Sequence, residues 1–137
     1  MVCGLTTSRR LLLLLLVALL AATSPNRGEA GGDPATGVRV FQYCYSCHTV
    51  DPNEKATLQG PSLNAIVGKR IAAQTDFDYS PALRAFAERH DVWSEDLLDR
   101  YIANPETVIP KTTMNFGGLV DHQERADLIA FLKAQTR

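Results

Sequence analysis

The chain of 137 residues begins with an apolar segment unlike anything later in the sequence. Arg9 and Arg10 precede twelve consecutive apolar residues, 11–22, after which residues 23–30 are mostly small or polar. This order predicts a secretory signal peptide, because twelve apolar residues fall short of the roughly 20 that a membrane-spanning helix needs. We therefore expect residues 1–30 to be removed, by cleavage between 22 and 30, leaving residues 31–137 as one exported domain.

After residue 30, apolar positions recur at helical spacing in four segments, each preceded by a capping residue. Asp33, followed by proline, predicts a helix of about twelve residues that runs to Cys47. Ser80, also followed by proline, predicts a short helix that ends near His90. These two helices lie on either side of a long segment, 50–78, in which prolines and glycines interrupt the chain and no alternation indicates a strand.

The other two helices lie in the second half of the chain. Ser94 caps a segment with an apolar stripe, and we expect this helix to stop at Asn104 because proline follows. Asp121, with glutamate three residues later, predicts a terminal helix whose inner face consists of Leu128, Phe131 and Leu132. The predicted fold class is all-α, with about four to five helices and long loops.

Composition narrows the possible functions. The whole chain is 45% hydrophobic and 21% charged, an ordinary globular composition, and three cysteines are too few for a disulfide scaffold. Residues 31–137 keep two cysteines and one methionine, with 11 basic against 14 acidic residues, a formal charge of −3. A mildly acidic domain does not fit nucleic-acid binding. A domain of this size would gain stability from a cofactor that enlarged its core.

Cys44, Cys47 and His48 form a C-x-x-C-H motif, the pattern of c-type haem attachment. At a helix end, residues i and i+3 lie on one face, so both thiols can add to the two vinyl groups on one porphyrin edge. Residue i+4 then lies under the same ring, where its imidazole can ligate iron. The motif predicts one haem c, covalently bound through both cysteines, with His48 as an axial ligand.

Other uses of a cysteine pair fit the sequence less well. Zinc needs four ligands, but residues 31–137 contain no third cysteine, and His90 and His122 lack a paired spacing. A thioredoxin-like dithiol belongs beside a βαβ pattern, which the sequence does not have. Export and the histidine directly after the second cysteine favour haem attachment.

Met114 is the only methionine after the predicted signal peptide, and it lies in an irregular segment rich in proline and glycine. A single methionine often merely fills a gap in a core. A thioether is also a soft ligand that suits a high-potential iron. We therefore predict Met114 as the sixth ligand, which would close the iron to small molecules and favour electron transfer.

Residues 33–137 resemble the class I cytochromes c, the group that contains mitochondrial cytochrome c and its soluble bacterial relatives. The resemblance rests on the motif together with Gly37, Phe41 and five later segments: 60–63, 77–80, 93–105 (Trp93, Tyr101 and Asn104-Pro105), 109–116 and 127–133. It implies the class I cytochrome c fold, in which helices and long loops wrap around one covalent haem.

The resemblance also implies roles for residues on both sides of the haem. The carbonyl of Pro61 would accept the second imidazole N–H of His48 and so orient the ring. Tyr101 would lie near the sulfur of Met114, with Thr112 close by.

Further roles follow from the same resemblance. Tyr79 and Trp93 would hydrogen-bond the buried propionate, and Gly37 would let the first helix cross closely against the last. Lys69 and Arg70 are both candidates to face a propionate, and the sequence does not distinguish them.

The function implied is that of a soluble, monomeric one-electron carrier in the periplasm, not an enzyme. It would dock transiently with respiratory or photosynthetic complexes or periplasmic dehydrogenases, steered by Lys69 and Lys111, and would meet a membrane only through membrane-bound partners. Two alternatives stay open: a haem subunit held in an oxidoreductase complex, and a ligand-binding haem protein in which Met114 leaves the iron open.

Overall fold

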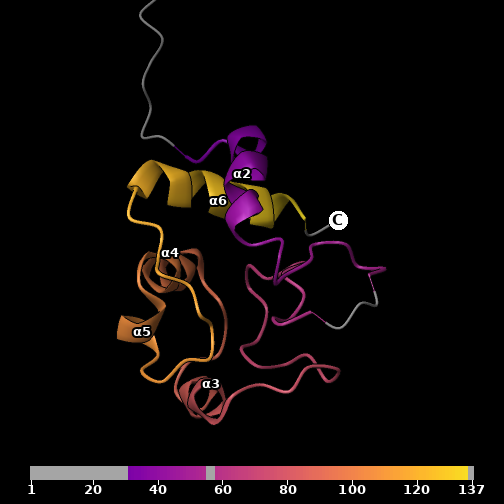
Figure 1. Ribbon diagram of the computed structural model, residues 1–137, viewed down its shortest axis with the longest axis vertical. Coiled ribbons are helices and arrows are strands. Elements are labelled where there is room, and N and C mark those ends of the chain that lie inside the picture. Colours follow the sequence, from indigo (N-terminus) through magenta and orange to yellow (C-terminus); the bar gives the residue numbers. More distant parts are fainter. Residues whose placement is uncertain (1–30, 55–57, 136–137) are drawn as a thin grey trace, which may run out of the picture.

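The structure is a computed structural model that describes residues 31–54 and 58–135, so the predicted signal peptide lies outside the described residues. The described chain forms the helices α2 (Pro34–Val40), η2 (Phe41–Tyr43, 3₁₀), α3 (Pro81–Ala87), α4 (Glu95–Ala103), α5 (Pro105–Val108) and α6 (His122–Ala134), joined by long loops (Figure 1). Within these ranges there is no strand, and one isolated antiparallel bridge pairs Arg70 with Val92. None of the described helices is long and apolar enough to span a membrane. The predicted all-α fold class is confirmed.

Helix α2 begins where the sequence predicts and ends earlier. The Asp33 carboxylate accepts the N–H groups of Ala35 and Thr36, each at 3.1 Å. The α-helix stops at Val40, and η2 follows as a tighter turn before the cysteine motif. The prediction of a helix of about twelve residues running to Cys47 is therefore wrong at its end, because i→i+3 bonds are mixed with i→i+4 bonds there: the Cys44 and Tyr45 N–H groups share the Phe41 carbonyl, and the Cys47 and His48 N–H groups share the Cys44 carbonyl.

Helix α3 is also shorter than predicted. The Ser80 hydroxyl accepts the Leu83 N–H at 3.2 Å, which confirms its start, but the helix ends at Ala87 rather than near His90. The N–H groups of Arg89 and His90 both bond to the Phe86 carbonyl, at 3.0 and 3.1 Å. Because these two N–H donors share one carbonyl, the chain makes a turn there and α3 does not continue.

Helix α4 ends before Asn104, as the following proline predicts. Asn104 then caps a helix that the sequence interpretation left as irregular, since its side chain accepts the Thr107 N–H at 3.1 Å and Pro105 opens α5. The same signal, a capping residue followed by proline, identified α2 and α3. It was present at Asn104 and could have identified α5.

Helix α6 starts at its predicted cap, where the Asp121 carboxylate accepts the Glu124 N–H at 2.8 Å. Leu128 and Leu132 are each 2% exposed, and Phe131 is partly buried, so the predicted inner face is confirmed.

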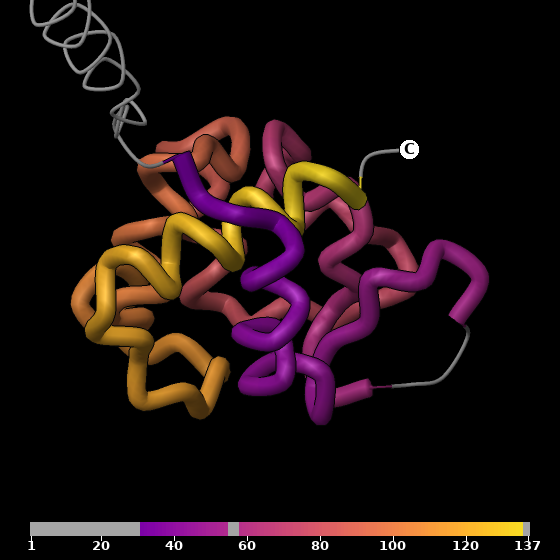
Figure 2. The backbone as a smooth tube through the Cα atoms, turned by 90° about the horizontal axis from the view of Figure 1, so that it is seen from above, coloured from indigo at the N-terminus to yellow at the C-terminus, as the bar shows by residue number. Residues whose placement is uncertain are grey.

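Helices α2 and α6 cross in close contact, with the first helix lying over the last (Figures 1 and 2). A methyl group at Gly37 would overlap the Asp127 carbonyl and the Phe131 side chain, so only glycine permits this approach. The Phe41 and Phe131 rings pack 5.3 Å apart, and the Asp33 N–H donates to the Asp127 carboxylate at 2.7 Å. The crossing packs the first described helix against α6, and the cysteine motif follows directly after η2.

Candidate haem-binding site

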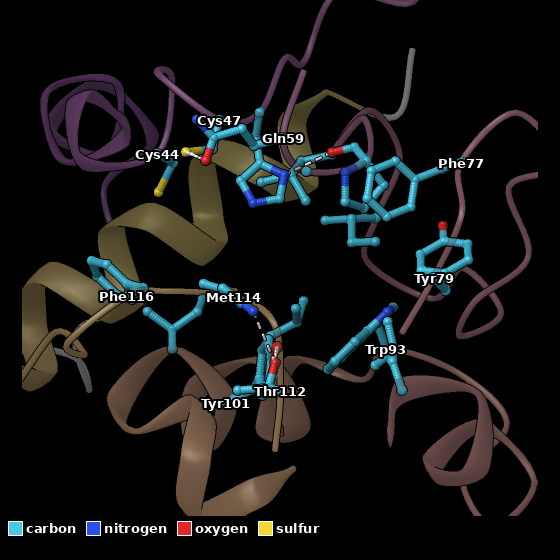
Figure 3. Close-up of a pocket in the computed structure, with 18 of the residues that line it drawn as sticks. Cys44, Cys47, Gln59, Phe77, Tyr79, Trp93, Tyr101, Thr112, Met114 and Phe116 are labelled. Carbon is cyan, nitrogen blue, oxygen red and sulfur yellow. Dashed lines mark hydrogen bonds between the residues drawn. The ribbon is translucent and has the colours of Figure 1, made fainter. Parts of the chain in front are cut away.

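A cavity of about 480 Å³ lies between the cysteine motif, the loop after it, helices α4 and α6, and the segment that leads to α6. This volume is in the range of cofactor sites in proteins. All nine residues predicted to bind the haem line it: Cys44, Cys47, His48, Pro61, Tyr79, Trp93, Tyr101, Thr112 and Met114. In Figure 3 the two cysteines and Met114 lie on opposite sides of the open space. The structure therefore brings together residues that lie up to 70 positions apart in the sequence.

One side of the cavity, the proximal wall, consists of residues 44–48 with Gly60 and Pro61. The N–H groups of Cys47 and His48 both bond to the Cys44 carbonyl, at 3.0 and 2.9 Å. The motif thus forms a helical turn although the α-helix has already ended, which preserves the i, i+3, i+4 relation that the prediction required.

The two thiols are free and half-buried. Burial raises the pKa of the Cys44 thiol to about 11, with a further contribution from the neighbouring Cys47. A redox-active dithiol needs a thiolate at neutral pH, so this environment does not favour that use of the pair. The Cys47 thiol donates to the Gln59 side chain at 3.9 Å. No sequence pattern singled out Gln59, an exposed polar residue in a loop.

The His48 imidazole is fixed by its neighbours. Its Nδ1 lies 2.7 Å from the Pro61 carbonyl, and because a carbonyl only accepts, Nδ1 carries the proton. Nε2 then has the free lone pair that a metal ion needs. Burial lowers the pKa of His48, and the bond to Pro61 offsets part of this effect, so the ring is neutral at pH 7. A methyl group at Gly60 would overlap the imidazole, so glycine makes room for the ring.

The opposite side, the distal wall, consists of Tyr101, Thr112 and Met114. The Met114 N–H donates to the Thr112 hydroxyl at 3.2 Å, and that hydroxyl lies 2.9 Å from the Tyr101 hydroxyl. Burial raises the pKa of Tyr101, opposed by its bond to Thr112, so the phenol stays protonated. Tyr101 of α4 is thus linked to the Met114 backbone through the Thr112 hydroxyl.

Aromatic side chains close the cavity at a third side. Trp93 and Tyr79 are 7% exposed each, and Trp93 packs against Tyr101 with ring centres 5.1 Å apart. Burial raises the pKa of Tyr79, so this hydroxyl also remains a donor. In Figure 3, Phe77, Tyr79 and Trp93 border the open space away from the cysteines. Two buried hydrogen-bond donors, the Tyr79 hydroxyl and the Trp93 indole N–H, suit a carboxylate inside an apolar cavity.

Lys69 and Arg70 both line the cavity and both have partners on the protein. The Lys69 ammonium donates to the Asn64 carbonyl at 3.2 Å, and Arg70 pairs with Asp91 at 3.4 Å on the surface. Sequence reasoning also missed Gln74, which lines the cavity and donates to the Ser62 carbonyl at 2.8 Å. Gln74 lies in a predicted loop, and no sequence pattern there predicts its contact with Ser62.

The donor set of the cavity fits a haem. Among residues 31–54 and 58–135, no three His, Cys, Asp or Glu side chains gather to hold a bare metal ion. One imidazole and one thioether on opposite walls therefore suit an iron whose other ligands come from a macrocycle. The remaining lining is largely apolar, with Leu63, Ile66, Leu98, Ile102, Leu128 and Leu132.

These features define a small all-α protein built around one c-type haem. The family model described as cytochrome c matches residues 34–136. The chain belongs to the cytochrome c family, and it is accordingly an electron-transfer protein with a covalently bound c-type haem rather than an enzyme.

Individual relatives agree with this assignment. Cytochrome c2 of Rhodomicrobium vannielii is 42% identical over 106 residues, which cover 77% of this chain and 82% of the relative. Cytochrome c-550 of Ancylobacter novellus is 38% identical over 100 residues, 73% of this chain and 92% of the relative. The solved structure of cytochrome c2 from Rhodospirillum centenum superposes with a TM-score of 0.71 at 32% identity, covering 77% of this chain and all of that structure.

Proposed function

We propose that this protein is a one-electron shuttle whose haem iron is ligated by His48 and Met114 and whose porphyrin is linked to Cys44 and Cys47. The observation that carries the proposal is that Cys44 and Cys47, whose turn also holds the His48 imidazole, lie across the same cavity from the Met114 thioether. His48 and Met114 would both hold the iron, which would favour electron transfer over binding of small molecules.

Each residue of the cavity would contribute to that task. When bound, the haem supplies an iron that changes between Fe(III) and Fe(II). Pro61 would keep the His48 ring in one orientation, and Thr112 would keep the Met114 backbone in place. Burial by Trp93 and its neighbours would exclude water, so that little has to rearrange when the charge on the iron changes.

The cellular setting is part of the proposal. The basic, apolar and small-residue order of residues 1–30 supports export by a cleavable signal peptide to the periplasm, with residues 31–137 as the cytochrome domain. As a monomer, the protein would exchange electrons with redox partners by transient docking. Lys69 and Lys111 would steer the encounter, and membranes would be reached only through membrane-bound partner complexes.

The experiment is a spectrum and a redox titration of the purified holoprotein and of the Met114→Ala variant. We expect the oxidised wild type to show a sulfur-to-iron charge-transfer band in the far red and the reduced form not to bind CO. Met114→Ala should lose the band, bind CO and have a lower potential, because the thioether raises it.

Two results would contradict this reading. A wild type without the far-red band that binds CO readily is an open-site haem protein. A chain isolated only in a stable stoichiometric complex is a dedicated subunit and not a free shuttle.

A further inference from the structure

Arg125 is a buried charged residue that the cavity does not use. It lies in the first turns of α6, is 8% exposed, and does not line the cavity. Its Nη1 donates to the carbonyls of Leu119 and Val120, at 2.9 and 2.7 Å. Its Nε donates to the Asp99 carboxylate of α4 at 2.7 Å. One guanidinium therefore joins α4, α6 and the segment between Met114 and α6.

The same face of α4 also binds this segment directly, without Arg125. Ile102 lies one helical turn after Asp99, so the two residues share a face. The Ile102 carbonyl accepts the Leu119 N–H at 2.9 Å. Leu119 is thus held by its N–H to α4 directly and by its carbonyl to α4 through Arg125 and Asp99.

Leu119, which these contacts anchor to α4, is close to Met114 along the chain. Leu119 follows Met114 by five residues, and the anchor before Met114 is the Thr112 hydroxyl. Between these two anchors the chain is short, so the thioether cannot move far while both hold. Without Arg125, Leu119 keeps its N–H bond to the Ile102 carbonyl; if that bond opens too, the next fixed point is the start of α6 at His122. Because each residue adds up to about 3.5 Å of reach, freeing Leu119 gives the chain that carries Met114 roughly 10 Å more slack.

We propose that Arg125, oriented by Asp99, is a positioning residue for Met114: it anchors the segment after the thioether and so keeps that ligand over the cavity. This inference rests on the proposed function, since it takes Met114 as an axial ligand. The contacts of Arg125 are charge-assisted and largely buried, which makes them stronger than exposed pairs on the same surface. The Arg100–Asp96 pair of α4, at 3.0 Å, is exposed and joins two residues of the same helix.

The test measures how easily an external ligand displaces Met114. Imidazole is titrated into the oxidised holoprotein while the far-red band is followed, for wild type, Arg125→Gln, Arg125→Lys and Asp99→Asn. We expect Arg125→Gln to bind imidazole roughly tenfold to a hundredfold more tightly, because several hydrogen bonds of a charged group are lost. Arg125→Lys should show a smaller increase, since an ammonium keeps the charge but not the planar fork. Asp99→Asn should show the smallest increase.

Two control variants separate positioning from general stability. Asp127→Asn alters another buried carboxylate of α6, 4% exposed, which accepts hydrogen bonds from the Asp33 N–H near α2 and from the Gln123 side chain. It should lower the free energy of unfolding in guanidinium while leaving imidazole affinity within about twofold of wild type. Arg100→Gln should change neither quantity appreciably.

The outcomes distinguish the two proposals. If Arg125→Gln and Asp127→Asn raise imidazole affinity equally at equal loss of stability, or if no variant changes it, Arg125 is merely structural and this inference is overturned. In both cases the wild-type band still supports Met114 as a ligand. A wild type without the band overturns the proposed His/Met ligation itself, and the inference with it.

Discussion

The proximal wall comes mainly from five consecutive residues and their neighbour loop, whereas the distal wall is assembled from α4 and from a segment that follows α5. In the proximal wall, the backbone of Cys44, Cys47 and His48 is held by hydrogen bonds within one turn of chain, and only the His48 ring takes a distant partner, Pro61, 13 residues on. In the distal wall, Met114 depends on Thr112, and Thr112 contacts Tyr101 eleven residues away in the sequence.

The difference indicates where each wall is vulnerable. A local turn keeps its geometry as long as its own backbone bonds form, so only changes within or against it should disturb the proximal wall. The distal wall depends on packing between separate elements, and elements joined by few contacts open more readily than local turns. We therefore expect Met114 to be the more easily displaced of the two proposed ligands.

The largest effect should come from removing the proximal thiols. In the double variant Cys44→Ser, Cys47→Ser, no haem can be covalently attached, and the cavity loses the group that completes the core. We expect no haem to remain with the chain after denaturing electrophoresis, measured by haem staining, and a chain that unfolds at lower temperature than wild type. Haem retained covalently by this variant would contradict the assignment of the thiols.

Gly60→Ala should disturb the proximal wall from outside the motif. The added methyl group overlaps the His48 ring, which cannot move away without losing the Pro61 hydrogen bond. Overpacking of this kind costs about 1–3 kcal/mol of unfolding free energy, measurable by guanidinium titration. Gly117→Ala is the matched control, because a methyl group there meets nothing within 4 Å. Equal stability of both variants would argue that His48 is free to shift.

Thr112→Val should affect the distal wall alone. It removes the acceptor of the Met114 N–H and the partner of the Tyr101 hydroxyl while keeping the side-chain shape. We expect a loss of about 1–2 kcal/mol in unfolding free energy and a weaker far-red band, with covalent haem attachment unchanged. If the band is unaffected, the threonine does not help to hold the ligand, and the contrast between the walls is smaller than proposed.

Asp33→Asn should have the smallest effect and should leave both walls intact. The Thr36 hydroxyl, followed by the Ala35 N–H, lowers the pKa of Asp33 from its ordinary value of 3.8. The stabilisation by the charged form is therefore present above about pH 3.8 and lost as the pH falls through the lower folded-state pKa.

Asparagine still caps the helix, so the variant isolates the charge. Its melting temperature should lie slightly below that of wild type at pH 7, and the gap should close well below pH 3.8. A gap that persists at low pH would show that the substitution acts through something other than the carboxylate charge.

Local sequence signals predict much of the fold. Capping residues at 33, 80, 94 and 121 identified the starts of four helices, because a cap acts on the backbone within three residues. The ends of α2 and α3 were predicted too late, since they depend on how the last carbonyls are shared, and periodicity does not encode that. Helix α5 carries the same cap-plus-proline signal at Asn104, where one proline both ends α4 and begins α5.

The sequence by itself determined the chemistry of this protein: the spacing of Cys44, Cys47 and His48 and the single later methionine specify a covalent haem and its candidate ligands. Local spacing suffices for the proximal group because one turn of chain holds all three residues. Only the tertiary structure decided that Met114 faces them across one cavity and that Arg125 anchors the segment beside it. Met114 lies 66 residues after His48, and Arg125 is oriented by Asp99, 26 residues before it, so no local pattern specifies either pairing.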